Sequence, residues 1–190
     1  MDTGVREARA GDAARIADIH VESWRNTYRG IMPDSFLDGM STARSRIGWD
    51  NTLASLTGGS KVFVHEDEAA VVNAFVHFGP GRDSAMPFPC EIYAIYVDLP
   101  GRGRGTGTKL LDACAKAAAA AGWNGMYLWA AAKNTYSSFY LKNGGERGAV
   151  KTKKIAGTDV ALEAFCWPDL KRHLERAVSP TDGRKPTRCN

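Results

Sequence analysis

A strand, a glycine-rich loop and a helix between residues 91 and 121 constrain the fold of this chain more than any other segment. Residues 91–97 are rich in β-branched and aromatic side chains, which is typical of a strand. Residues 100–107 hold four glycines and two arginines, and 109–121 is rich in alanine and leucine, which favours a helix. Such a junction presents free backbone N–H groups and the positive end of a helix dipole. The segment therefore predicts a site for an anion.

Two common phosphate-binding motifs are absent from this loop. The dinucleotide fingerprint G-x-G-x-x-G needs a third glycine where the chain has Thr106, Thr108 or Leu110. The P-loop needs a Gly-Lys pair followed by Ser or Thr, whereas Lys109 follows Thr108 and precedes Leu110. A flexible turn without a chemical role would leave the glycines, the arginines and the helix start unexplained. Another kind of anion-binding loop is expected.

The rest of the chain reads as further helices and strands. Asp12 is suited to cap a helix with an apolar stripe, and a second helical region between 36 and 53 is expected to be broken. Asn134 is expected to cap a helix that ends before Gly144. Further strands are predicted at 61–65, 71–78, 126–129, 149–155 and 160–167, with a long loop at 80–89. Strands that alternate with helices and close on a hairpin indicate a mixed α/β sheet.

Composition narrows the class of protein. A length of 190 residues fits one domain, and 44% hydrophobic with 24% charged residues is ordinary for a globular chain. The net charge of +4 comes entirely from residues 171–190, so the basic balance gives weak support for nucleic-acid binding. The longest alanine-rich stretch is too short to span a bilayer, and the N-terminus lacks the pattern of a signal peptide. A cytoplasmic protein without membrane contacts is expected.

The cysteines and histidines indicate no metal site. Cys90, Cys114, Cys166 and Cys189 are scattered and form no C-x-x-C pair, so neither zinc nor a disulfide framework is predicted. The four histidines likewise show no ligand spacing. No metal is therefore expected.

The loop does fit R-x-x-G-x-G, from Arg102 to Gly107, directly after the strand. At this point the chain resembles the GCN5-related N-acetyltransferases, the GNAT superfamily. Asn134-x-x-x-x-Phe-Tyr140-x-x-x-Gly144 is similar to the second signature of that family. Trp24-x-x-x-Tyr-Arg-Gly-Ile-Met-Pro and Phe-Cys-Trp167 look like a bacterial subgroup of it. The resemblance covers about residues 3–170.

The resemblance implies a mixed, largely antiparallel sheet of six to seven strands flanked by helices. Its fourth strand, 91–97, and its fifth, 126–130, would splay apart and admit the pantetheine arm of acetyl-CoA. The domain would span 1–170, and 171–190 would be a basic, mobile tail. By this resemblance the residues that bind acetyl-CoA are Ile95, Val97, Arg102, Gly103, Arg104, Gly105, Thr106, Gly107, Thr108 and Asn134.

The resemblance also implies roles in catalysis. Glu91 matches the position of a general base in many family members, although an exposed carboxylate at a strand end is the simpler interpretation from composition. Tyr140 matches a general acid that protonates the leaving thiolate, although packing alone would also explain a tyrosine there. Trp24 and Tyr28 lie four apart on one helix face and are candidates to flank the acceptor. The 80–90 loop is expected to line the acceptor pocket.

The function expected from these residues is acetyl transfer from acetyl-CoA to a primary amine of a small molecule or peptide, by direct attack in a ternary complex. A catalytically silent acyl-CoA-binding module is the alternative, and the presence of both Glu91 and Tyr140 argues against it. An RNA-binding protein is less well supported, because only two Arg-Gly pairs occur and no aromatic residue separates them. A homodimer would be common for the family. The acceptor amine is left open.

Overall fold

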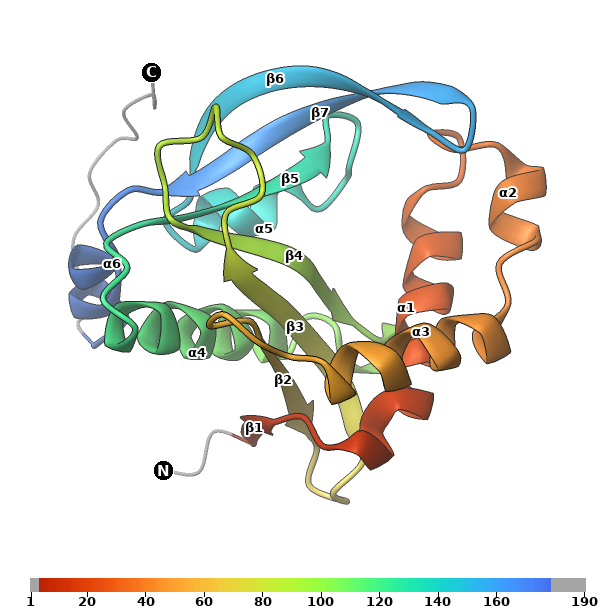
Figure 1. The fold of residues 1–190 in the computed structure, drawn as a ribbon, viewed down its shortest axis with the longest axis horizontal. Helices are drawn as coiled ribbons and strands as arrows, with labels where there is room; N and C mark the ends of the chain where they lie inside the picture. The colour runs from red at the N-terminus through yellow and green to blue at the C-terminus, as the bar shows by residue number, and fades with distance from the viewer. Residues whose placement is uncertain (1–3, 179–190) are drawn as a thin grey trace.

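The computed structural model describes residues 4–178. They form one seven-stranded sheet in the order β1-β2-β3-β4-β5-β7-β6, flanked by helices on both faces (Figure 1). The strands are β1 Val5–Glu7, β2 Lys61–Glu66, β3 Val72–Pro80, β4 Cys90–Val97, β5 Met126–Ala131, β6 Glu146–Ile155 and β7 Thr158–Trp167. The helices are α1 Ala13–Thr27, α2 Asp34–Asp38, α3 Thr42–Ala54, α4 Thr106–Ala120, α5 Ser137–Lys142 and α6 Leu170–Val178.

Each neighbouring pair of strands is antiparallel except β4 and β5, which run parallel. The parallel pair is joined through α4, as a crossover connection requires. The predicted fold class is therefore confirmed: a mixed, largely antiparallel sheet with helices on its faces.

Two apolar clusters hold the helices to the sheet. On one face, Leu110, Leu111 and Cys114 of α4 are fully buried against β3, β4, β5 and β7. On the other face, Ile16 and Ile19 of α1 are fully buried against β2 and β3, together with residues of α3. The apolar stripe that was predicted on α1 therefore faces the sheet. Burial of apolar side chains of this kind is the main favourable contribution to folding.

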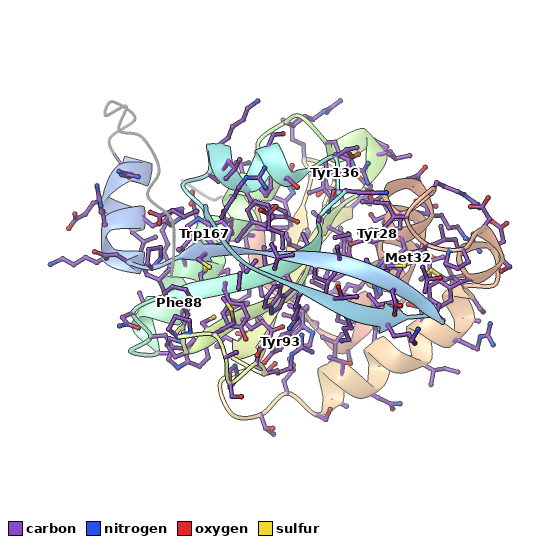
Figure 2. All side chains as sticks on the ribbon, turned by 90° about the horizontal axis from the view of Figure 1, so that it is seen from above. Tyr28, Met32, Phe88, Tyr93, Tyr136 and Trp167 are labelled. Carbon is purple, nitrogen blue, oxygen red and sulfur yellow. The ribbon has the colours of Figure 1, made fainter. Side chains whose placement is uncertain are left out.

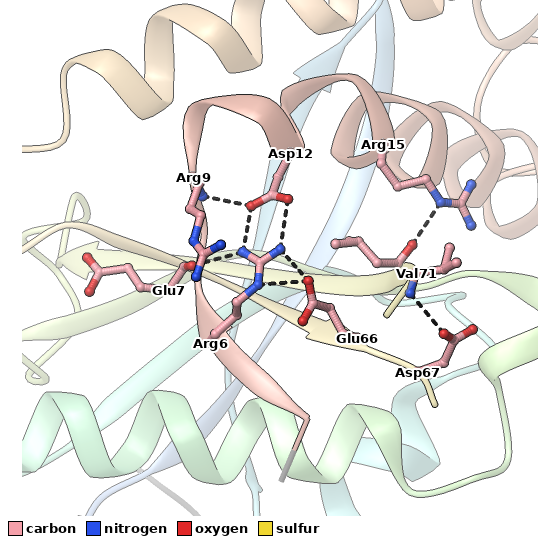
Figure 3. A network of polar contacts seen from close by, with 9 residues as sticks. Arg6, Glu7, Arg9, Asp12, Arg15, Glu66, Asp67 and Val71 are labelled. Atoms are coloured by element: carbon pink, nitrogen blue, oxygen red, sulfur yellow. Dashed lines mark hydrogen bonds and ion pairs between the residues drawn. The ribbon is translucent and has the colours of Figure 1, made fainter. Parts of the chain in front are cut away.

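A polar network ties the first strand to the start of α1. The Arg6 guanidinium donates to both oxygens of Asp12, at 2.7 and 3.0 Å, and to Glu66 of β2 (Figure 3). Asp12 precedes α1 as predicted, but its side chain makes no capping hydrogen bond to the helix. Instead it accepts from Arg6 and from the backbone N–H of Arg9. β1 was not predicted, because three residues are too few to show a strand pattern.

The chain beyond β7 departs from the expected tail at its start. Residues 170–178 form α6, which packs on α4. Leu170 is buried, Leu174 packs against the same core, and His173 lies 3.3 Å from Asp112 of α4. Two leucines four residues apart therefore attach α6 to the core, while its other residues are mostly charged. Because of this composition, the helix was not predicted from the sequence. Residues 179–190 of the expected tail lie outside the described residues. No helix between residues 4 and 178 combines the length and the apolar character that crossing a bilayer requires.

Candidate active site

The parallel strands β4 and β5 separate after a short contact. They pair only at Cys90–Met126, Glu91–Tyr127 and Ile92–Leu128. Beyond Ile92, β4 continues to Val97, and no strand within residues 4–178 pairs with it on that side. The splayed pair that the family resemblance implied is therefore present. A cavity of about 600 Å³ lies at this split and is lined by both strands, by the loop before α4 and by α5.

A β-bulge in β4 decides which side chains face the cavity. The pairing with β3 steps from Phe78–Ile92 to His77–Ala94, which leaves Tyr93 without a partner. Ile92 therefore packs with the α4 cluster, whereas Ala94 packs with the α1 cluster. An extra residue in one strand shifts the alternation of side chains between the two faces. The bulge lies where the two strands part.

One end of the cavity is suited to an anion. Gly103 and Gly105 have φ angles of 75° and 80°, a left-handed conformation that costs glycine little, and a Cβ at either would meet no atom within 4 Å. Gly105 is the N-cap of α4, a helix of 15 residues whose first N–H groups have no partner within the helix. Open backbone and free N–H groups at a helix N-terminus are the features that suit a backbone site to phosphate. α4 begins at Thr106, three residues before the predicted start.

The two loop arginines point to different places. Arg102 lines the cavity, and its Nε donates to the carbonyl oxygen of Val97 at 3.1 Å. Its guanidinium also donates to the hydroxyl of Tyr136 and lies 4.9 Å from the centre of that ring. Arg104 lines an adjoining hollow together with Lys109. The side chains of Arg102 and Arg104, both predicted to bind acetyl-CoA, therefore lie in different hollows.

Asn134 shapes the loop between β5 and α5. It is buried and lines the cavity, and its Oδ1 accepts from the backbone N–H of Tyr136 at 2.8 Å. The helix was expected to begin next to Asn134, but it begins at Ser137, because the intervening residues form a turn closed by this bond. The turn brings Tyr136 to Arg102.

Tyr140 lies deep in the cavity with its hydroxyl available. The residue is buried and packs against Phe165 and Trp167, with ring centres 4.9 and 6.5 Å away. Burial raises the pKa of the Tyr140 hydroxyl, so the group holds its proton at neutral pH. Within residues 4–178 this hydroxyl has no hydrogen-bonding partner. It can therefore donate a proton into the cavity.

The opposite end of the cavity is aromatic. The hydroxyls of Tyr28 and Tyr96 lie 3.4 Å apart, and burial raises the pKa of both groups. Tyr93 and Trp129 also line the cavity, and Trp129 packs against the same apolar cluster as Tyr28. Figure 2 shows Tyr28 and Tyr93 on opposite sides of the β6–β7 hairpin in that view. Trp24 stands behind Tyr28, with ring centres 4.8 Å apart, and does not line the cavity.

Glu91 lies beside the cavity but not in its lining. Its carboxylate accepts four hydrogen bonds: the backbone N–H, Nε and Nη2 of Arg82 donate at 2.9, 3.1 and 2.7 Å, and the Tyr127 hydroxyl donates at 3.1 Å. Burial opposes ionisation of this carboxyl, but the bonds from Arg82 and Tyr127 outweigh burial and hold its pKa below the ordinary value. Arg82 belongs to the loop after β3 and lies 3.9 Å over the ring of Tyr93. The carboxylate therefore holds that loop on β4.

The structure brings most of the predicted site residues together. Ile95, Val97, Arg102, Gly103, Gly105, Thr106, Gly107, Thr108, Asn134, Tyr28 and Tyr140 all line the one cavity, whereas Arg104, Trp24 and Glu91 do not. The side chains of Tyr93, Tyr96, Trp129 and Tyr136 also line the cavity, although the sequence did not predict them there. The first two lie in a strand to which only backbone contacts were assigned, and the pairing of Tyr136 with Arg102 has no local sequence signal.

Comparisons with known proteins agree with this architecture. A family model for the acetyltransferase (GNAT) domain matches residues 58–144. The uncharacterized N-acetyltransferase YuaI of Bacillus subtilis is 35% identical over 166 residues, which cover 87% of this chain and 93% of YuaI.

Two solved structures share the fold. A GCN5-related N-acetyltransferase from Rhodopseudomonas palustris has a TM-score of 0.68 at 24% identity, covering 86% of this chain and 94% of that one. A phosphinothricin acetyltransferase from Sinorhizobium meliloti, in complex with acetyl-CoA, has a TM-score of 0.64 at 21% identity, covering 87% of each chain. The identity to YuaI over most of both chains, the matched domain and the splayed β4–β5 pair lead to one conclusion: the chain belongs to the GNAT family of N-acetyltransferases.

Proposed function

We propose that this protein moves an acetyl group from acetyl-CoA to a primary amine of a small molecule or peptide, by direct attack of the amine in a ternary complex. The observation that carries the proposal is the continuity of the cavity. Its anion-binding end at the loop before α4 and its aromatic end beside α1 meet at the split between β4 and β5. Two substrates that enter from opposite ends would meet beside Tyr140.

The anion-binding end fits the pyrophosphate of acetyl-CoA, the ligand of the Sinorhizobium meliloti enzyme. Gly103 and Gly105 leave the backbone open, and the N-terminus of α4 supplies N–H donors. Arg102 supplies a planar guanidinium that is held by Val97 and Tyr136 and suits phosphate oxygens. The unpaired edge of β4 beyond Ile92 offers backbone groups to the pantetheine arm. Acetyl-CoA supplies the thioester.

Tyr140 is proposed as the proton donor to the leaving sulfur. Its hydroxyl is protonated at neutral pH and lines the cavity, as a general acid requires. The backbone N–H groups of β4 at the split are the proposed donors to the oxyanion of the tetrahedral intermediate.

The role of Glu91 as a base stays a prediction. A carboxylate that accepts four hydrogen bonds outside the cavity lining could take a proton only through water. A group whose pKa is held low is also a weak base. The contacts of Glu91 support a positioning role, in which it fixes Arg82 and the loop after β3 against Tyr93.

Two measurements test the proposed function. Saturating acetyl-CoA, at about 100 times its Kd, should stabilise the fold by about 2.7 kcal/mol, which corresponds to a Tm rise of about 5–10 °C for a chain of this size. Acetyl-pantetheine, which lacks the pyrophosphate, should give a much smaller rise. A panel of amines, assayed by release of the CoA thiol, should then contain acceptors. Binding of acetyl-CoA without turnover of any amine would favour the silent acyl-CoA-binding module.

A further inference from the structure

The cavity contains no side chain that can take up a proton at neutral pH. Of residues 4–178, those that line it include no Asp, Glu or His. Its charged side chains are the cations Arg102, from the loop before α4, and Lys142, from α5. Tyr28, Tyr96 and Tyr140 of the lining are proton donors, because burial raises the pKa of each hydroxyl.

Two acids beside the aromatic side chains Tyr93 and Trp129 are engaged by other partners. Glu91 is held by Arg82 and Tyr127. Asp83, in the same loop as Arg82, pairs with Lys151 of β6. Lys151 in turn lies 3.9 Å over the ring of Trp129, just as Arg82 lies over Tyr93. Both carboxylates therefore bind cations that pack on the rings of Tyr93 and Trp129. Neither carboxylate is directed to an incoming amine.

The proton balance of acetyl transfer shows what this lining permits. When a neutral amine attacks the thioester, an N–C bond forms, the C–S bond breaks, the nitrogen loses one proton and the sulfur gains one. The reaction then needs only a proton donor for the sulfur and a route by which that donor regains a proton. The Tyr140 hydroxyl can serve as the donor, and water can return its proton. When the acceptor arrives as an ammonium ion, one further proton must leave before attack. No side chain of the lining can receive that proton.

We propose that the acceptor is a weakly basic amine: the α-amine of a peptide or of an amino-acid amide with a large apolar or aromatic side chain. This inference rests on the proposed acetyl transfer. An α-amine has a pKa of about 7.7–8.0 and an alkylamine one of about 10.4, so the neutral fraction at pH 7 differs by about 200–400-fold. The aromatic end formed by Tyr28, Tyr93, Tyr96 and Trp129 is suited to an apolar first side chain.

A matched pair of acceptors tests the inference. L-Phenylalaninamide and 2-phenylethylamine differ by one carboxamide, which lowers the amine pKa in the first. With saturating acetyl-CoA, kcat/KM at pH 7 should be about 100-fold higher for phenylalaninamide, because its larger neutral fraction outweighs its lower nucleophilicity. For phenylethylamine kcat/KM should rise about tenfold per pH unit between pH 7 and 9, whereas for phenylalaninamide it should level off near pH 8.

A substitution at Thr27 provides an independent test of the inference. Thr27, the last residue of α1, is half-buried and lines the cavity. Thr27→Asp places a carboxylate in the lining and should raise kcat/KM for phenylethylamine at pH 7 by at least tenfold over Thr27→Asn, which matches it in size without the charge. For phenylalaninamide the two variants should differ by less than threefold.

The outcomes separate the inference from the function on which it rests. Equal or faster acetylation of phenylethylamine at pH 7 would overturn the inference and leave the acetyltransferase activity established. Turnover of neither amine by protein that acetyl-CoA stabilises in a thermal-shift assay would also overturn it. Absence of any stabilisation by acetyl-CoA would instead overturn the proposed function itself.

Discussion

Replacing Glu91 with glutamine should lower the free energy of unfolding by about 1–3 kcal/mol at pH 7. The side chain of Glu91 is 6% exposed and accepts four hydrogen bonds, three of them from Arg82. Removing one partner of a fully buried pair costs about 3–5 kcal/mol. Here the Arg82 side chain is 62% exposed and can recover water, which places the expected loss below that range.

The pH dependence of this loss has a definite sign. The folded-state pKa of Glu91 is held below its ordinary value, so its ionised form contributes stability above the unfolded-state pKa of about 4.3. That contribution disappears as the pH falls through the lower folded-state pKa. The difference in stability between the wild type and Glu91→Gln should therefore be full at pH 7 and should shrink below about pH 4.

Thermal and urea unfolding of the two proteins provide the assay. A loss of 1–3 kcal/mol corresponds to a Tm decrease of about 3–10 °C for a chain of this length. Asp159→Asn is the control, because Asp159 and its partner Lys154 are both 66% exposed and such pairs contribute less than about 1 kcal/mol. A loss below 0.5 kcal/mol for Glu91→Gln, or one that persists unchanged at pH 3, would refute the reasoning.

The same variant tests the catalytic role predicted for Glu91. If its carboxylate acts as a base, kcat/KM should fall by about 10²–10⁴-fold at neutral pH, and the defect should shrink as the pH approaches the pKa of the amine. If it positions the loop after β3, the defect should be the same at every pH. The lining of the cavity leads us to expect the second result.

Other substitutions test the remaining parts of the site. Tyr140→Phe should lower kcat by about 10–100-fold without changing the Kd of acetyl-CoA. Alkaline pH should not restore kcat, because protons are then scarcer. Full activity of this variant would exclude Tyr140 as the acid. Arg102→Gln should weaken acetyl-CoA binding, measured by calorimetry, about tenfold or more. Arg104→Gln should weaken it less, because of these two arginines only Arg102 lines the cavity. Equal losses of affinity would contradict the different roles of the two arginines. Tyr136→Phe removes the hydroxyl that receives the Arg102 hydrogen bond and should raise the KM for acetyl-CoA by about 3–10-fold with kcat unchanged. A fall in kcat alone would show another role for this side chain.

Features carried by a few consecutive residues could be predicted from the sequence. The strand 91–97, the glycines before α4 and the alanine-rich helix follow from backbone preference and periodicity, so these three elements could be predicted. The apolar spacing of Ile16 and Ile19 likewise identified the buried face of α1. Elements without a local signal were not predicted: β1 has three residues, and four of the nine residues of α6 are Lys, Arg or Glu.

The family, the mixed sheet and the loop that is suited to an anion could all be inferred from the residues alone, because each depends on local chemistry at fixed spacing. Which side chains surround the reaction space depends on the fold as a whole. The bulge at Tyr93 separates the faces on which Ile92 and Ala94 pack, and Arg82 holds Glu91 outside the cavity lining. Tyr28, directly after α1, and Tyr140 of α5 line the same cavity although more than a hundred residues separate them in the sequence. Strand register and long-range pairing set these positions, and neither is encoded in the periodicity of any single segment.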